Sequence, residues 1–372
     1  MRLDQLPTPQ VLVDRPRLLN NLDRAQAFAA AAGARLRPHA KTHKSPVIAR
    51  WQIERGAAGI CCAKLGEAEV FAEAGIDDIR LPYPVNPSNA ARLMALMDRA
   101  SMSIIVDHPR VARGWSDAMA RAGRTLDVLV KVDVGFHRCG IDPDAPGALD
   151  FVRAVASMPG LRFRGLLSHA GHGYHAASED ELASIAAKEL EILTTLAARA
   201  KAAGVEVAEL SVGATPTLRF SAKLRGLTEL RPGNCAYFDR TQVSLGAATV
   251  ADCALTVLAT VVSKPAPDRI ILDSGSKTLT NDQARGIHKA PGFGAILTSD
   301  LSAVDDSLLV ERLSEEHAVV RVTGSTTLEP GDRVRILPNH SCVVSNLVDT
   351  VRLVEGDRVV DTLAVAARGK IQ

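Results

Sequence analysis

Three short segments of the sequence carry side chains that could do chemistry. The first is RPHAKTHK, residues 37–44, in which Lys41 follows an apolar run typical of a strand and precedes a helical pattern. A lysine held at such a junction, with other cations nearby, can form a Schiff base with a carbonyl compound. Lys44 is the nearest competitor for this role, but it lies one helical turn further on and is expected at the surface.

The second segment is PNHSC, residues 338–342. On a strand, His340 and Cys342 would point to the same face, because residues i and i+2 of a strand share a side. An imidazole and a thiolate suit Zn²⁺ or a softer transition metal better than Mg²⁺, and two protein ligands leave positions open for water and a substrate oxygen. The same spacing also fits a buried structural histidine beside a core cysteine.

The third segment is VGATPT, residues 212–217, which combines a glycine, two hydroxyl groups and free backbone N–H groups. Such a loop at the end of a late barrel strand can bind a phosphate group. An ordinary capped turn has a similar composition, so the segment alone leaves both interpretations open.

Eight short apolar runs between residues 34 and 240 are typical of strands, and most are separated by amphipathic helical stretches such as 64–74, 89–100 and 179–203. The runs are hydrophobic almost throughout rather than alternating, which indicates a parallel sheet covered on its outside. Eight such units predict an α/β fold with a TIM-like (β/α)8 barrel, and an open doubly wound sheet is the alternative. The predicted strands are 36–39, 59–62, 79–83, 103–107, 126–133, 161–169, 207–213 and 228–232.

After residue 240 the pattern changes to short strands joined by turns such as Pro330-Gly331-Asp332, without a long helical period. The sequence therefore predicts a barrel domain over residues 1–240 and an all-β domain over residues 241–372. The segment QVLVD, residues 10–14, could pair with either domain. The predicted strands of the second domain are 255–263, 269–273, 318–322, 333–337, 342–347, 351–354 and 359–366.

Residues just past the carboxyl ends of barrel strands line the active site of such folds. Here those positions are rich in lysine, arginine, histidine, hydroxyl groups and glycine. We expect the five richest segments to meet at one mouth of the barrel: residues 37–44, 135–140, 168–174, 211–217 and 231–237.

Composition excludes some classes of function. The net charge of the 372 residues is +2, from 44 basic and 42 acidic side chains, so nothing favours binding to nucleic acid or to an anionic membrane. The first ten residues are polar and contain two prolines, unlike a secretory signal. The six cysteines form no regular framework, so we expect most of them to be reduced and buried in a cytoplasmic enzyme.

Together these segments resemble the fold type III pyridoxal-phosphate (PLP) enzymes of the D-threonine aldolase and eukaryotic-type D-serine dehydratase family, whose barrel is of the alanine racemase N-terminal type. The resemblance runs from Thr8-Pro9 to residues 367–369. It implies that Lys41 holds the cofactor and that His340 and Cys342 bind a divalent metal, with Zn²⁺ or Mn²⁺ favoured. It also implies cofactor-binding roles for Arg138 at the pyridine nitrogen, for His169 against the ring, and for Gly213, Thr215 and Tyr237 around the phosphate or ring.

The resemblance leaves two reactions on a β-hydroxy D-amino acid. In a dehydratase, Lys41 removes the α-proton and the metal assists departure of hydroxide, which leaves a 2-oxo acid and ammonia after hydrolysis. In an aldolase, the Cα–Cβ bond breaks to give glycine and an aldehyde. The HSC and VGATPT motifs favour a dehydratase acting on D-serine or D-threo-3-hydroxyaspartate, because the family's aldolases typically have a histidine, one residue and an aspartate at the metal. His172 and His175 keep the aldolase open, since either could act as the base.

An amino-acid racemase of this architecture is less favoured. It would need a second acid/base group, a tyrosine from the β domain, and the three tyrosines all precede residue 240. We take Lys41, His169 and Tyr174 as the catalytic candidates of a lyase. The resemblance also implies a homodimer with its sites near the interface.

Overall fold

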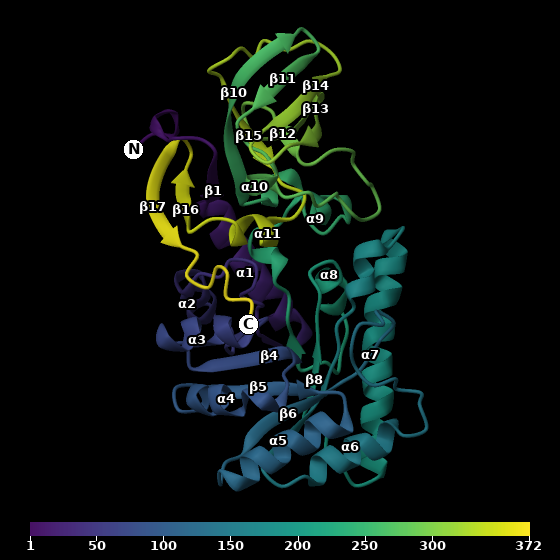
Figure 1. Cartoon of the computed structure of the whole chain (residues 1–372). Coiled ribbons are helices and arrows are strands. Elements are labelled where there is room, and N and C mark those ends of the chain that lie inside the picture. Colours follow the sequence, from purple (N-terminus) through teal and green to yellow (C-terminus); the bar gives the residue numbers. More distant parts are fainter.

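The computed structural model describes all 372 residues as a parallel barrel joined to an antiparallel β domain (Figure 1). Eight parallel strands pair in the order β2-β9-β8-β7-β6-β5-β4-β3. A parallel bridge between His39 and Cys61 joins the two ends of this series, so the sheet closes, and the barrel is confirmed over the open sheet. The strands are β2 (Arg35–Leu36), β3 (Ile60–Cys61), β4 (Asp78–Pro84), β5 (Ser101–Val106), β6 (Leu126–Lys131), β7 (Leu161–Leu167), β8 (Glu209–Val212) and β9 (Glu229–Leu230).

Helices cover the outside of the barrel (Figure 1), and local signals set their ends. The helix α1 (Arg15–Ala32) begins after Asp14, whose carboxylate accepts a hydrogen bond from the backbone N–H of Arg17, and ends at Gly33 with a left-handed φ of 69°. No helix of the chain is long and apolar enough to cross a membrane. The other helices of this part are α2 (Pro46–Glu54), α3 (Leu65–Glu73), α4 (Ala90–Met97), α5 (Pro109–Arg121), α6 (Ala148–Ser157), α7 (Glu179–Ala202), α8 (Leu218–Ser221) and α9 (Arg240–Ser244), with 3₁₀ turns at Leu3–Gln5, Pro87–Asn89, Gly171–His175, Asn234–Ala236 and Val250–Asp252.

The second sheet has nine strands in the order β11-β14-β13-β12-β15-β10-β1-β16-β17. Because β11 also pairs with β10, six of these strands close into a small barrel. The N-terminal strand β1 belongs here, since it pairs with β10 and β16. Two strands, β12 and β13, lie where the sequence predicts none. The strands are β1 (Gln10–Asp14), β10 (Leu255–Ala266), β11 (Arg269–Leu272), β12 (Ala295–Leu297), β13 (Val304–Leu313), β14 (Ala318–Val322), β15 (Arg333–Leu337), β16 (Thr350–Glu355) and β17 (Arg358–Ala364), with α10 (Ser276–Leu279) and α11 (Ser341–Asn346) between them.

One predicted strand of this domain is wrong, because residues 342–347 lie in and just beyond the helix α11. Valines favour a strand, but contacts with the barrel domain override that preference. The backbone N–H of Ser341 donates to Asp239 Oδ2 at 3.0 Å, and the hydroxyl of Ser345 donates to the carbonyl of Thr42 at 2.5 Å. The helix also turns Val344 into the apolar core.

Two apolar cores of 51 and 28 buried residues fill the barrel wall and the β domain. Helix α1 contributes to both, with Ala25 and Ala29 in the first and Leu18 and Leu22 in the second. Between them, the amide of Asn21 donates to two backbone carbonyls near the domain junction. The helix therefore ties the β domain to the barrel.

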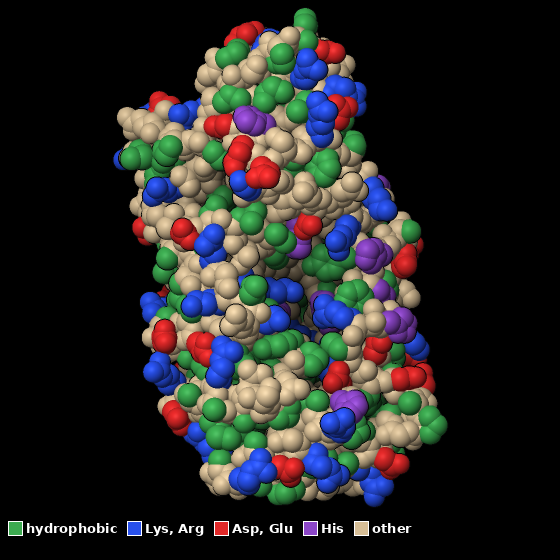
Figure 2. All heavy atoms as spheres, in the orientation of Figure 1, with side chains coloured by type: hydrophobic (Ala, Val, Ile, Leu, Met, Phe, Trp, Pro, Cys, Tyr) green, Lys and Arg blue, Asp and Glu red, His purple; other side chains and the backbone are tan.

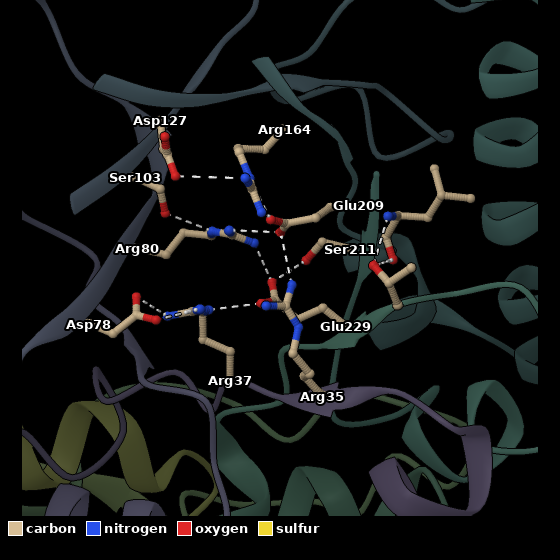
Figure 3. Close-up of polar contacts among 12 residues, drawn as sticks. Arg35, Arg37, Asp78, Arg80, Ser103, Asp127, Arg164, Glu209, Ser211 and Glu229 are labelled. Atoms are coloured by element: carbon tan, nitrogen blue, oxygen red, sulfur yellow. Dashed lines mark hydrogen bonds and ion pairs between the residues drawn. The ribbon is translucent and has the colours of Figure 1, made fainter. Parts of the chain in front are cut away.

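Charged residues, rather than apolar ones, fill the amino-terminal end of the barrel interior (Figure 3). The carboxylate of Glu229 lies 2.8 Å from Arg37 Nε and 2.5 Å from Arg80 Nη1, and Arg80 in turn lies 2.9 Å from Glu209. Although burial raises the pKa of Glu229, Arg80 and Arg37 lower it to about 2. The arginine of the RPHAKTHK segment is thus a structural ion-pair partner below the active site.

Candidate active site

The carboxyl end of the barrel forms a cavity beneath the β domain, and Figure 2 shows this face hollowed between the two. All five predicted strand-end segments contribute residues to its lining. Two of the predicted residues, Gly213 and Tyr237, do not line it. The predicted residues that do are Lys41, Arg138, His169, Tyr174, Thr215, His340 and Cys342.

Lys41 stands in a tight turn after β2. Two backbone hydrogen bonds of 2.8 Å flank it, from Ala40 N–H to the carbonyl of Cys61 and from Lys44 N–H to the carbonyl of Ala40. Its side chain is exposed to the cavity and has no protein partner. The expectation for Lys44 is wrong: it is only 7% exposed, because its ammonium group lies 2.5 Å from Glu67 Oε1. That buried ion pair leaves Lys41 as the available amine.

Two histidines flank Lys41 and stay neutral. Burial, with Lys131 and Lys41 nearby, holds the pKa of His169 well below its usual range. Burial and Lys41 do the same to the pKa of His39. The Nδ1 of His169 lies 2.7 Å from the carbonyl oxygen of Gly213, so Nδ1 carries the proton and Nε2 is left as an acceptor. Gly213 therefore contributes to the site by holding the His169 ring in place.

Arg138 reaches the cavity on a loop shaped by Asp133, whose carboxylate accepts hydrogen bonds from three successive backbone N–H groups. The guanidinium carbon of Arg138 lies 4.9 Å from the centre of the Phe136 ring. The same ring packs edge-on against His169, with 5.7 Å between ring centres. Arg138 and His169 are thus positioned by one aromatic side chain.

The VGATPT loop offers unpaired donors to the cavity. The backbone N–H groups of Ala214 and Thr215 make no hydrogen bond within the chain, and both residues line the cavity. At Gly213 a Cβ atom would come within 3.0 Å of the backbone of Arg231, so only glycine fits. Unpaired backbone N–H groups in a close-packed loop are what a phosphate group needs, so the loop fits a phosphorylated cofactor.

Of the two tyrosine candidates, only Tyr174 lines the cavity. Tyr174 lies in the turn Gly171–His175 and lines the cavity, and burial raises the pKa of its hydroxyl well above its usual range. Tyr237 is fully buried in the core of the β domain, and its hydroxyl has no partner in the chain.

His340 and Cys342 lie at the start of α11, on the β-domain side of the cavity. Nδ1 of His340 is 2.6 Å from Asp282 Oδ2, and Cys342 Sγ is 3.2 Å from Thr42 Oγ1. Although burial raises the pKa of the Cys342 thiol, the adjacent His340 lowers it overall. Contacts with Cys342 and Asp282 raise the pKa of His340 to about 10 against the effect of burial, so without a metal the two side chains form a thiolate–imidazolium pair. A thiolate and an imidazole are a donor set that fits a transition metal. No set of three or more His, Cys, Asp or Glu side chains in the chain forms a metal-binding group.

The structure adds residues that the sequence did not single out. Asp282, Gln283 and Arg285 line the cavity from residues 280–294, and Asp239 and Gln242 line it from the barrel side. None of them stands in a motif, and residues 280–294 form no helix or strand. One general rule points to such a residue: a histidine that binds a metal usually donates its other ring N–H to a carboxylate. That rule predicts an acidic partner for His340, but it does not say which acid.

Comparison with family models and known proteins agrees with this architecture. Residues 13–241 match the alanine racemase N-terminal domain, and residues 254–354 match the serine dehydratase domain. D-threonine aldolase of Arthrobacter sp is 35% identical, over 99% of this chain and 94% of that protein. D-threo-3-hydroxyaspartate dehydratase of Delftia sp. strain HT23 is 31% identical, over 96% of each.

Solved structures agree as well. The Delftia dehydratase superposes with a TM-score of 0.91 at 30% identity, covering 98% of both chains. D-threonine aldolase from Filomicrobium marinum gives 0.88 at 31% identity, covering 100% of this chain and 98% of the other. An alanine racemase of Clostridium difficile, at 14% identity and a TM-score of 0.72, shares the fold. The chain belongs to the fold type III PLP enzymes, in the family of the D-threonine aldolases and D-serine dehydratases.

Proposed function

We propose that this protein is a PLP- and divalent-metal-dependent lyase that dehydrates a β-hydroxy D-amino acid, D-serine or D-threo-3-hydroxyaspartate, to a 2-oxo acid and ammonia. The observation that carries the proposal is that Lys41 and the His340–Cys342 pair line one cavity from opposite domains. This reaction needs two groups: an amine that holds the cofactor and takes the α-proton, and a cation that binds the β-hydroxyl.

The barrel residues hold the cofactor and move the α-proton. Bound PLP, held through Lys41, would withdraw electrons from the substrate α-carbon. Once the substrate amine has displaced Lys41 from the cofactor, the neutral amine of Lys41 would take the proton from Cα. Arg138, which cannot readily give up its proton, would donate to the pyridine nitrogen and keep that nitrogen unprotonated. Neutral His169 would lie against the ring, and the unpaired N–H groups of Ala214 and Thr215 would bind the phosphate.

With its pyridine nitrogen unprotonated, the cofactor would withdraw electrons less strongly. The departing hydroxyl group would therefore need a separate activating group. A cation on His340 and Cys342 would polarise the β-hydroxyl as a Lewis acid, with Zn²⁺ or Mn²⁺ as the proposed ion. Asp282 holds the imidazole by accepting from Nδ1, so Nε2 faces the cation. Two solved variants of D-threo-3-hydroxyaspartate dehydratase support this assignment: one, in a metal-free form, has a cysteine replaced by alanine, and the other has a histidine replaced two positions earlier. The spacing is that of His340 and Cys342.

Retro-aldol cleavage to glycine and an aldehyde is the second candidate. The 35% identical Arthrobacter protein is a D-threonine aldolase, and His175 lines the cavity where a base for the β-hydroxyl could act. The cysteine at the proposed metal site favours the dehydratase, because a solved dehydratase has a cysteine two positions after a histidine, as Cys342 follows His340. A racemase is not proposed, since no tyrosine follows Tyr237.

Product identification tests the proposal. The purified holoenzyme is incubated with D-serine, D-threonine and D-threo-3-hydroxyaspartate, and 2-oxo acid, ammonia, glycine and aldehyde are measured. We expect 2-oxo acid with an equal amount of ammonia, lost on chelation and on Cys342→Ala while the cofactor absorbance remains. Cys139→Ala, at a half-buried cysteine outside the cavity, is the matched control and should keep full activity. If glycine and an aldehyde are the main products, the protein is an aldolase and the dehydratase proposal is wrong.

Two expectations accompany this proposal. The family resemblance implies a homodimer, which sedimentation of the holoenzyme would test. The cytoplasmic location is inferred from the unpaired cysteines, since all six are free and four of them are buried.

A further inference from the structure

Arg285 is a cation of the cavity that the proposed mechanism leaves unused. It lies between α10 and β12 and lines the cavity. Its backbone N–H donates to Thr241 Oγ1 at 3.4 Å, which attaches this segment to the barrel side. The guanidinium group is exposed and makes no ion pair or hydrogen bond within the chain.

The other cations of the cavity already have partners or roles. Arg231 is 5% exposed, and its Nε donates to Ser211 Oγ at 2.6 Å, so it is part of the barrel interior. Arg138 stacks on Phe136, and Lys41 is the proposed cofactor lysine. Arg285 is therefore the cavity cation that is free to meet a substrate anion.

The position of Arg285 along the chain places it near the proposed metal site. Asp282, three residues earlier, contacts His340, and both line the cavity with Arg285. In the proposed reaction the cation binds the hydroxyl on the substrate β-carbon. A group on this side of the cavity would then face the remaining substituent of that carbon, which is hydrogen in serine, methyl in threonine and carboxylate in 3-hydroxyaspartate.

We propose that Arg285 binds a carboxylate on the β-carbon, so that the preferred substrates are β-hydroxy D-amino dicarboxylic acids. This inference rests on the proposed function. A guanidinium group can bind a carboxylate through two parallel hydrogen bonds, which a hydrogen or a methyl group cannot match.

The test compares two substrates that differ only in this carboxylate. Steady-state kinetics of the holoenzyme are measured with D-threo-3-hydroxyaspartate and D-serine for the native protein and for Arg285→Gln. We expect Arg285→Gln to lower kcat/KM for 3-hydroxyaspartate by about 30- to 100-fold, mainly through KM, the range for one lost charge-assisted hydrogen-bonded pair. With D-serine, kcat/KM should change by less than about threefold. Arg285→Lys should recover part of the loss, because it restores the charge without the paired geometry.

Lys289→Gln is the matched control, because it removes an exposed cation from the same segment without touching the cavity lining. It should leave both substrates unaffected. Equal losses on both substrates with Arg285→Gln would overturn the inference, since the arginine would then act on the shared α-carboxylate. Native enzyme that dehydrates D-serine but not 3-hydroxyaspartate would also overturn it, while leaving the proposed function intact. Turnover of neither substrate would instead defeat the proposed function.

Discussion

Replacing Glu229 by Gln should destabilise the barrel strongly. The side chain of Glu229 is fully buried, and its carboxylate contacts Arg37, Arg80 and the hydroxyl of Ser211, the last at 2.6 Å. The amide keeps the shape but removes the charge, which leaves two buried guanidinium groups short of a partner. The pKa of Glu229 falls from 4.5 to about 2 on folding. At about 1.36 kcal/mol per pKa unit this is worth about 3 kcal/mol, similar to the 3–5 kcal/mol lost when a buried ion pair is broken.

Urea unfolding followed by tryptophan fluorescence measures this loss. Both tryptophans, Trp51 in α2 and Trp115 in α5, are on barrel helices, so the signal reports the barrel. Glu69→Gln, on the barrel helix α3, is the matched control: its carboxylate lies 2.8 Å from Arg92, but both side chains are more than one third exposed, so the loss should stay below about 1 kcal/mol. If the two variants lose the same stability, the buried charges are not what stabilises the end of the barrel.

The pH dependence gives a second check on the same residue. Because the folded pKa of Glu229 lies below the unfolded value, its contribution is fully present above pH 4.5 and is lost as the pH falls towards about 2. The difference in unfolding free energy between native protein and Glu229→Gln should therefore be constant between about pH 7 and 5 and shrink below that. A difference that stays constant down to about pH 3 would refute the assigned pKa.

Three further outcomes follow from the active site. Lys41→Ala should abolish turnover and the visible absorbance of the bound cofactor, and retained absorbance would move the cofactor anchor to another lysine. Asp282→Asn should weaken the affinity of the apoenzyme for Zn²⁺ by about 10- to 100-fold in a metal titration, and unchanged affinity would mean that it does not orient His340. Gly213→Ala should weaken PLP binding, measured by equilibrium titration, because its Cβ would lie 2.9–3.0 Å from backbone atoms of Arg231. Unaltered affinity would show that the VGATPT loop can shift.

The architecture was predictable because barrel strands leave a strong local signal. Each of the eight runs is apolar, short and followed by polar residues, and each overlaps a strand of the parallel sheet. The cavity followed from topology alone, since the carboxyl ends of barrel strands must share one mouth. The same argument predicts that Lys41 and His169 lie at this mouth, and both line the cavity.

The errors have a different physical origin, in contacts between segments distant in the sequence. Lys44 was expected at the surface, but Glu67 on α3 pairs with it inside the protein. Residues 342–347 read as a strand, but hydrogen bonds from α11 to the barrel domain make them helical. Asp282 carries no local pattern, because its role depends on a histidine 58 residues away. The local pattern of residue types carries no information about partners so far away in the sequence.

The proposed metal pair and the proposed cofactor lysine depend on one another through the domain junction. His340 and Cys342 are held by α11, and α11 is held in turn by the barrel, through Asp239 and the carbonyl of Thr42. Thr42 directly follows Lys41, and its hydroxyl lies 3.2 Å from Cys342 Sγ. A shift of the β domain would therefore move the thiolate away from the turn that carries the lysine. Neither domain holds the complete site, so the lyase reaction requires their fixed contact, which α1 and α11 maintain.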